Sequence, residues 1–252
     1  MQERFDAAFL KWTAVVTMFI DHMTCCMLEI ARNAEGQRMM YLLPQGELLD
    51  RIGRGIGRMA FPIYCFLLVE GFYHTRDRRR YLLRLLLLAV FSQPVFENAL
   101  FYHPAHRHLD TLFTLSIGLA SIWVIDMLRG IYGNAGGRQA SLLLRCALVL
   151  CGIAAAGAGC AVATVLRTDY RWGGVLTILL FYYLRGVREY AMAGGWIALS
   201  VYSESELLSF PAFLLIRLYN GERGRQNKYF FYLFYPAHLL VLLLVRRAIF
   251  GM

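Results

Sequence analysis

Two ionisable side chains, Lys11 and His22, lie eleven residues apart in the first apolar segment of the chain. On an α-helix, eleven residues return to the same face within about 20° and rise by about 16 Å. One helix face would therefore present an ammonium group near a membrane surface and an imidazole in the membrane interior. Because imidazole accepts protons near neutral pH, His22 is a candidate general base for acyl transfer to an amine or a hydroxyl.

This pattern suits a long anionic acyl donor such as acetyl-CoA. The donor's phosphates would meet cationic groups such as Lys11 at the mouth of a site, while its thioester reaches inward to the base. The spacing also allows a structural interpretation, in which Lys11 extends its ammonium group to the membrane surface and His22 only hydrogen-bonds a neighbouring helix.

Other ionisable residues lie in or beside apolar segments, where an unpaired charge is costly. Asp21 is adjacent to His22 but about 100° around the helix, so we expect it to orient or charge a partner rather than to bond His22. Arg54 and Arg58 share a helix face and are predicted to bind the donor's phosphates or to stabilise an oxyanion, with membrane anchoring as the alternative. Glu70, near the end of the same segment, joins His22 and Asp21 in the predicted catalytic set.

The acceptor is expected to meet residues from two later parts of the chain. Asp169 and Tyr170 form a polar turn between apolar segments, although a solvated turn would have the same composition. Tyr235 and His238 belong to an aromatic-rich last segment, where tyrosine commonly anchors a helix at the membrane surface. We predict these four residues to bind the acceptor.

No metal site is predicted. His103, His106, His108 and Asp110 lie in a loop without a helical i, i+4 pair of ligands, and helix capping or pairing with Arg107 explains the aspartate. The six cysteines lie in apolar segments without Cys-x-x-Cys spacing, so neither a zinc site nor a disulfide framework is indicated.

The elements that must position these residues are membrane helices. The 252-residue chain is 58% hydrophobic, and each crossing needs about 20 mostly apolar residues. We predict one all-α domain over residues 1–252, a polytopic transmembrane helix bundle of about nine helices (range eight to ten), in which segments six to eight are short enough to be partial or re-entrant. The expected crossings are 9–31, 55–73, 81–100, 110–128, 141–165, 173–184, 191–202, 207–217 and 229–246.

The charge distribution predicts the orientation. The net charge of +9 comes mainly from arginine, which gathers in the loops 75–80, 129–145, 185–188 and 217–228. Arginine clusters of this kind mark cytoplasmic loops rather than a nucleic-acid-binding surface, so we expect no nucleic-acid partner and a cytoplasmic amino terminus. Only the first long loop, with Arg38, Arg51 and Arg54, departs from this pattern. Without a cleavage site after the first segment, we expect a retained helix rather than a signal peptide.

Four stretches resemble the TraX family, in order and across nearly the whole chain: 10–22, 57–72, 168–176 and 231–239. The resemblance implies N-terminal acetylation of conjugative pilin, within the transmembrane acyltransferases that carry an Arg/Lys-x10-His motif and take acetyl-CoA from the cytoplasm. It identifies His22 as the catalytic histidine and Lys11 as its motif partner, and it implies a place in the bacterial cytoplasmic membrane. The acceptor would be a pilin or other peptide amine, or instead a hydroxyl of a glycan or lipid.

Two other classes of function stay open from the sequence. One is a transporter or a non-enzymatic component of a conjugation or secretion apparatus, in which buried charges line a path; the lack of an inverted repeat argues against a transporter. The other is a passive membrane scaffold in contact with lipids alone. A scaffold gives no reason for placing Lys11, Asp21, His22, Glu70 and Glu97 in apolar segments.

Overall fold

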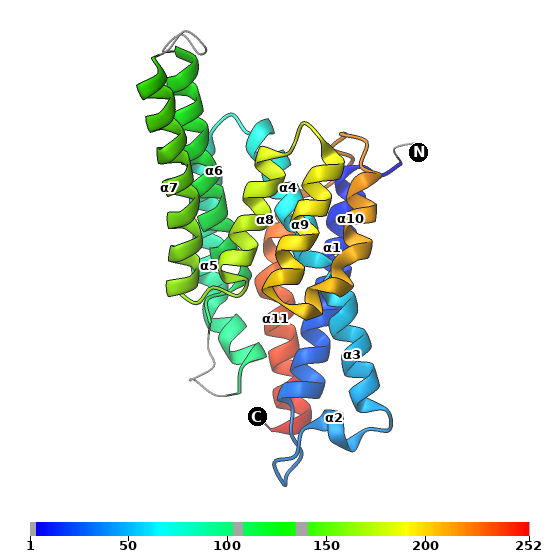
Figure 1. The fold of residues 1–252 in the computed structure, drawn as a ribbon. Helices are drawn as coiled ribbons and strands as arrows, with labels where there is room; N and C mark the ends of the chain where they lie inside the picture. The colour runs from blue at the N-terminus through cyan, green and yellow to red at the C-terminus, as the bar shows by residue number, and fades with distance from the viewer. Residues whose placement is uncertain (1–3, 103–107, 135–140, 252) are drawn as a thin grey trace.

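The computed structural model describes residues 4–102, 108–134 and 141–251, which form helices and no β-strand. The order along the chain is α1 (Ala7–Thr24), the π-helix η1 (Cys25–Ile30), α2 (Met39–Leu42), α3 (Gly46–Gly57), α4 (Ala60–His74), α5 (Arg78–Leu100), α6 (Thr111–Asn134), α7 (Leu142–Val165), α8 (Arg171–Tyr183), α9 (Arg188–Tyr202), the 3-10 helix η4 (Glu204–Ser209), α10 (Phe210–Arg217) and α11 (Lys228–Phe250) (Figure 1).

The helix lengths confirm a polytopic membrane bundle. In the described part of the chain, six helical stretches are long and apolar enough to cross a membrane: α1 with η1, α3 with α4, α5, α6, α7 and α11. By contrast, α8, α9 and α10 have 13, 15 and 8 residues. These three helices span only part of the height of the bundle and lie beside the upper part of α1, with α3 below them (Figure 1), as the short apolar segments predicted.

Polar caps fix where several helices begin. The side chains of Asp6, Asp77, Ser141 and Asn227 accept hydrogen bonds from backbone N–H groups in the first turns of α1, α5, α7 and α11. The Asp6 cap places Lys11 in an early turn of α1 and His22 in its last turn. The helix therefore carries the two motif residues toward opposite ends.

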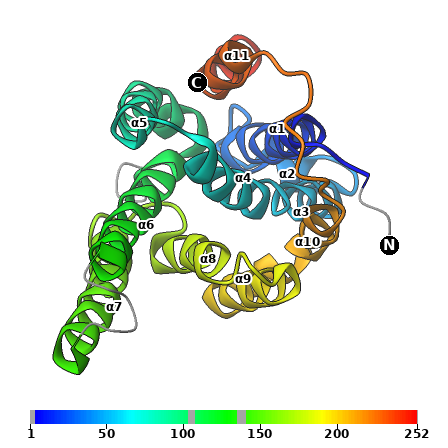
Figure 2. The same ribbon diagram turned by 90° about the horizontal axis from the view of Figure 1, so that it is seen from above.

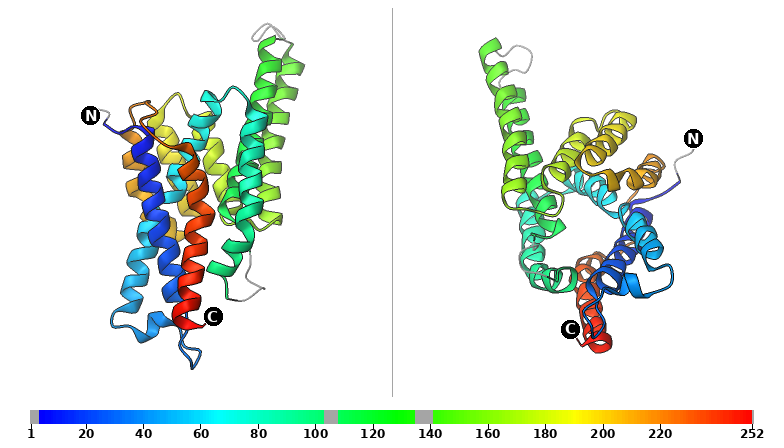
Figure 3. Two further views of the ribbon diagram at one scale, coloured as in Figure 1. Left: turned by 180° about the vertical axis from the view of Figure 1, so that it is seen from behind. Right: turned by 60° about the horizontal axis from the view of Figure 1, so that its bottom comes forward.

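The bundle is arranged around α4. Viewed from above, α1, α5, α6, α8 and α10 surround α4, while α7 lies at the edge against α6 (Figure 2). From behind, α1 and α11 lie side by side although they come from opposite ends of the sequence (Figure 3). The amino terminus lies at one end of the bundle, here called the amino-terminal end, and the carboxyl terminus at the other.

The second crossing is interrupted. α3 ends at Gly57 and α4 begins at Ala60, so Arg58 lies at the break. A Cβ atom on Gly57 would lie 2.2 Å from Oδ1 of Asp21, and one on Gly53 would lie 2.1 Å from Oγ1 of Thr24. These two glycines, four residues apart, therefore allow α3 to pack directly against α1.

Candidate active site

Lys11 and His22 line one cavity of about 760 Å³, in agreement with the face that their spacing defines. The cavity is bounded mainly by α1, α4, α5 and α11, with contributions from the start of α6 and from the turn before α8. Its walls between the two residues are apolar and include Met18, Leu68 and Leu85. The cavity therefore links a cation near the amino-terminal end to an imidazole inside the bundle.

The mouth of the cavity, at the amino-terminal end, is rich in cationic side chains. The Lys11 ammonium donates a hydrogen bond to Oε1 of Gln226 and lies 5.6 Å from the centre of the Phe231 ring. The α4–α5 and α10–α11 connections lie at this same end (Figure 1). They and the start of α5 supply further basic residues to the lining: Arg76, Arg80, Arg84 and Arg223.

The interior of the cavity brings together residues from distant segments. Tyr170 stacks on Phe61 with ring centres 3.5 Å apart. The Thr111 hydroxyl donates to Oδ2 of Asp169 at 2.8 Å. Asp169, Tyr170 and Tyr235 all line the cavity, so three of the four residues predicted to bind an acceptor face the space that His22 also faces.

His238, the fourth, lies behind His22 and does not line the cavity. Its Nε2 is 2.7 Å from Nδ1 of His22, and its own Nδ1 is 2.7 Å from the carbonyl oxygen of Phe234. The two imidazole planes differ by only 5°. Their side chains are 8% and 5% exposed, so the pair is buried between α1 and α11. The sequence identifies each histidine but not their contact, because 216 positions separate them.

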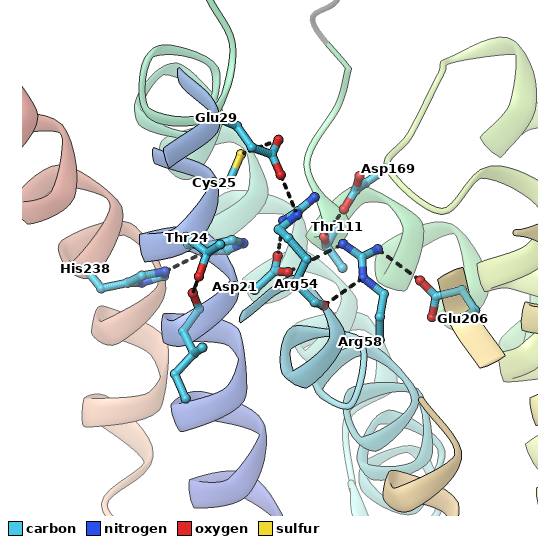
Figure 4. Close-up of polar contacts among 12 residues, drawn as sticks. Asp21, Thr24, Cys25, Glu29, Arg54, Arg58, Thr111, Asp169, Glu206 and His238 are labelled. Carbon is cyan, nitrogen blue, oxygen red and sulfur yellow. Dashed lines mark hydrogen bonds and ion pairs between the residues drawn. The ribbon is translucent and has the colours of Figure 1, made fainter. Parts of the chain in front are cut away.

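Asp21 bonds arginine rather than His22. Its carboxylate accepts from Arg54 at 2.7 Å and from Arg58 at 3.5 Å (Figure 4). Arg54 also pairs with Glu29 at 3.0 Å, and Arg58 with Glu206 at 3.0 Å. These five residues form a continuous ion-pair network at the break between α3 and α4, hereafter the Asp21 network.

Sequence reasoning gave no role to two members of the network, Glu29 and Glu206, and Glu206 is the more deeply buried of them. It is 1% exposed, and its Oε2 is buried without a hydrogen-bond partner among the described residues. Burial raises the pKa of Glu206 from 4.5 to about 7, although the nearby Arg58 acts in the opposite direction. In the sequence it is one of two glutamates in a short connection, and only their apolar surroundings distinguish them from a solvated turn.

Three predicted residues lie apart from the places that sequence reasoning gave them. Arg54 and Arg58 do not line the cavity and lie in the Asp21 network, away from the cationic mouth. Glu70 lines the cavity at the mouth, where its carboxylate pairs with Arg185 at 3.0 Å. Glu70 follows Arg58 by twelve residues, which is about 18 Å of helical rise. Because Arg58 contacts Asp21, the neighbour of His22, the structure does not place Glu70 beside His22.

The loop before α6 contributes a helix cap. Oδ1 of Asp110 accepts from the backbone N–H groups of Leu112 at 3.0 Å and Phe113 at 3.3 Å. His103 and His106 lie outside the described residues. Over the ranges that the structure describes, no group of three or more His, Cys, Asp or Glu side chains is arranged to hold a metal ion.

Comparison with known proteins gives a family match over nearly the whole chain. The model of the family described as TraX protein matches residues 6–246, a range that includes every candidate site residue. A probable fimbrial assembly protein, FimC of serogroup H1 from Dichelobacter nodosus, is 26% identical over 267 aligned residues that cover 94% of each chain. No solved structure matches significantly.

Proposed function

The chain belongs to the TraX family, and from this premise we propose that it is a membrane-bound acetyltransferase that moves an acetyl group from acetyl-CoA to an amine or hydroxyl acceptor. The observation that carries the proposal is the single cavity that joins the cationic mouth at Lys11 to the buried His22. The TraX family is related to pilin acetylation, and the similarity to a named fimbrial assembly protein links the chain to pilus or fimbrial processing.

The donor enters at the mouth. Acetyl-CoA carries its phosphates at one end and its thioester at the other, so the basic residues around Lys11 hold the phosphates. The long pantetheine arm then lies along the apolar walls formed by residues such as Leu68 and Leu85. This arrangement brings the acetyl carbonyl to the interior, where His22 and Tyr235 face the cavity.

His22 acts as the general base. It takes the proton from the acceptor amine or hydroxyl while the acceptor's nitrogen or oxygen forms a bond to the acetyl carbon. The carbon–sulfur bond then breaks, and the thiolate of coenzyme A takes the proton back from His22. Arg58 lies within electrostatic reach of Tyr170 and Asp21, so it supplies positive potential for the oxyanion at the interior end.

The acceptor enters from the side of the cavity opposite the mouth. Asp169 and Tyr170 line the cavity there, in the α7–α8 connection. A carboxylate such as Asp169 favours an amine over a neutral hydroxyl, because the amine arrives as an ammonium group and loses one proton to solvent before the neutral amine attacks. We therefore place a peptide amine, such as the amino terminus of a pilin, ahead of a glycan or lipid hydroxyl.

The orientation of the protein in the membrane follows from the basic residues at the amino-terminal end of the bundle. The arginine-rich connections α4–α5, α8–α9 and α10–α11 lie at the amino-terminal end (Figure 3). In a bacterial cytoplasmic membrane this end faces the cytoplasm, where acetyl-CoA is available, and lipids cover the exposed apolar helix faces. The carboxyl-terminal end then faces outward, toward the acceptor.

Mass spectrometry of the acceptor tests the proposal. The purified protein is incubated with acetyl-CoA and one of two peptides. The first has a free amino terminus, and the second has a blocked amino terminus and offers a serine hydroxyl as the acceptor. We expect acetylation at the amine by the wild type, and at least about 100-fold less by His22→Ala. Met23→Ala is the matched control, because Met23 is the exposed neighbour of His22 on α1. Equal transfer by His22→Ala and wild type would contradict the proposal.

A further inference from the structure

The hydrogen bonds of the two buried histidines determine where their protons lie. The Phe234 carbonyl oxygen only accepts, so the Nδ1 of His238 at 2.7 Å must carry a proton. A neutral His238 then has an unprotonated Nε2, which accepts. Because that Nε2 is 2.7 Å from Nδ1 of His22, the Nδ1 of His22 must be the donor.

The opposite direction of donation would require a charged His238. If Nε2 of His238 donated to His22, both of its ring nitrogens would be protonated. His238 is 5% exposed, and its neighbours Phe19, Phe234 and Tyr235 are aromatic. No carboxylate forms an ion pair with it among the described residues. An unpaired buried imidazolium is costly, so the neutral arrangement is favoured.

This arrangement fixes the reactive atom of His22. With the proton held on Nδ1, the lone pair is on Nε2, which makes no hydrogen bond within the described residues, and His22 lines the cavity. Free histidine side chains favour the opposite tautomer, with the proton on Nε2. Without its partner, His22 would therefore present an N–H group rather than a base to the cavity.

We propose that His238 is a positioning residue that holds His22 in its Nδ1–H form and thereby presents Nε2 of His22 as the base. The proposal rests on the acetyltransferase function argued above. It also replaces contact with the acceptor as the role of His238, since both ring nitrogens of His238 are already bonded, one to His22 and one to Phe234. When His22 accepts the proton at Nε2, its Nδ1–H bond to His238 steadies the resulting imidazolium.

Two variants of His238 separate positioning from folding. His238→Gln keeps an oxygen that can accept from Nδ1–H of His22, whereas His238→Phe keeps a ring of similar shape that can stack on Phe234 but removes the acceptor. Val241→Ala is the control, because Val241 is exposed on the same helix. All proteins carry ¹⁵N-labelled histidine, and the His22 signals are assigned by their loss in His22→Asn.

The measurements are the ¹⁵N tautomer signature of His22 and the rate of acetyl transfer. We expect a protonated Nδ1 and an unprotonated Nε2 in the wild type, in Val241→Ala and in His238→Gln. In His238→Phe the proton moves to Nε2, and transfer falls by about 100-fold or more, while His238→Gln stays within about tenfold of wild type. A folded His238→Phe that loses activity but keeps the wild-type tautomer would overturn the proposal.

An Nε2–H tautomer in the wild type would overturn it equally. Failure of the proposed function gives a different result. If the tautomers follow the expectation but no protein transfers acetyl, wild type included, the assignment of the hydrogen-bond chain is supported and the acetyltransferase proposal is contradicted.

Discussion

At the scale of single residues, Asp21 connects the break in the second crossing to the first helix. Its carboxylate is shared by Arg54, in the last turn of α3, and by Arg58, at the break between α3 and α4. Buried ion pairs contribute little compared with apolar packing, but removing one partner leaves the other charge without compensation. The Asp21 network is therefore sensitive to loss of any one member.

Arg54→Gln tests this sensitivity. The change removes the 2.7 Å ion pair of Asp21 and the 3.0 Å ion pair of Glu29. Because the Arg54 side chain is 30% exposed, we expect a loss of about 1–3 kcal/mol in stability. Arg51→Gln, one turn earlier on α3 and exposed, should change stability by less than about 0.5 kcal/mol. Thermal unfolding in detergent compares the two variants. Equal midpoints for both would show that the network does not stabilise the fold.

Glu206 gives the fold a pH dependence. Its pKa is raised by burial to about 7 from 4.5, so the folded state favours the protonated acid. This contribution is fully present below pH 4.5 and is lost as the pH rises through about 7. We expect the wild-type unfolding midpoint to fall between pH 5 and 8 more steeply than that of Glu206→Gln. The exposed Glu204→Gln should follow the wild type, and a Glu206→Gln curve parallel to both would contradict the expectation.

At the scale of elements, close contact between α1 and α3 holds Asp21 in place. Gly57→Ala introduces a methyl group 2.2 Å from the Asp21 carboxylate, so the carboxylate must move away from its arginines. We expect a lower unfolding midpoint and slower acetyl transfer. Gly55→Ala is the control in the same helix, because its methyl group meets only the end of the Leu208 side chain at 3.1 Å. Normal stability and activity in Gly57→Ala would show that this contact is dispensable.

Most elements could be predicted from hydropathy, and the site only in part. Each of the nine expected segments matches an observed helix, because apolar length and polar caps such as Asp6 are local properties, whereas α2 and most of α3 lie in the stretch expected to be the first long loop. The face shared by Lys11 and His22 also follows from helical period alone. The bond from His22 to His238 and the place of Glu206 beside Arg58 depend on packing between distant segments, which no single segment encodes. The place of Glu70 at the mouth likewise depends on packing, because its segment alone does not show at which end of the cavity the carboxylate lies.

At the scale of the whole molecule, the cationic mouth and the buried His22 lie at different depths of one bundle. The amino terminus and the arginine-rich connections share one end, while the carboxyl terminus lies at the other (Figure 1). The proposed entry of an anionic donor at the mouth is therefore separate from the side at which Asp169 and Tyr170 lie. The proposed reaction therefore passes an acetyl group across the interior of the bundle.

Reporter fusions test the orientation. Alkaline phosphatase folds to an active enzyme only outside the cytoplasm. We expect it to be active when fused to the carboxyl terminus and inactive when fused after Gly221, in the connection before α11. Fluorescent-protein fusions at the same positions should give the reverse pattern. Active phosphatase after Gly221 would place the cationic mouth on the outer side and would contradict entry of acetyl-CoA from the cytoplasm.

The central claim is that His22 is the base for acyl transfer from acetyl-CoA, and binding and thiol release by the purified protein test it most directly. Wild type, His22→Ala, Lys11→Ala and the control Met23→Ala are compared in detergent after their folding has been verified. We predict that His22→Ala binds acetyl-CoA like the wild type but releases free thiol at least about 100-fold more slowly, while Lys11→Ala binds more weakly. The claim would be contradicted if His22→Ala released free thiol at the wild-type rate, or if none of the folded proteins bound acetyl-CoA.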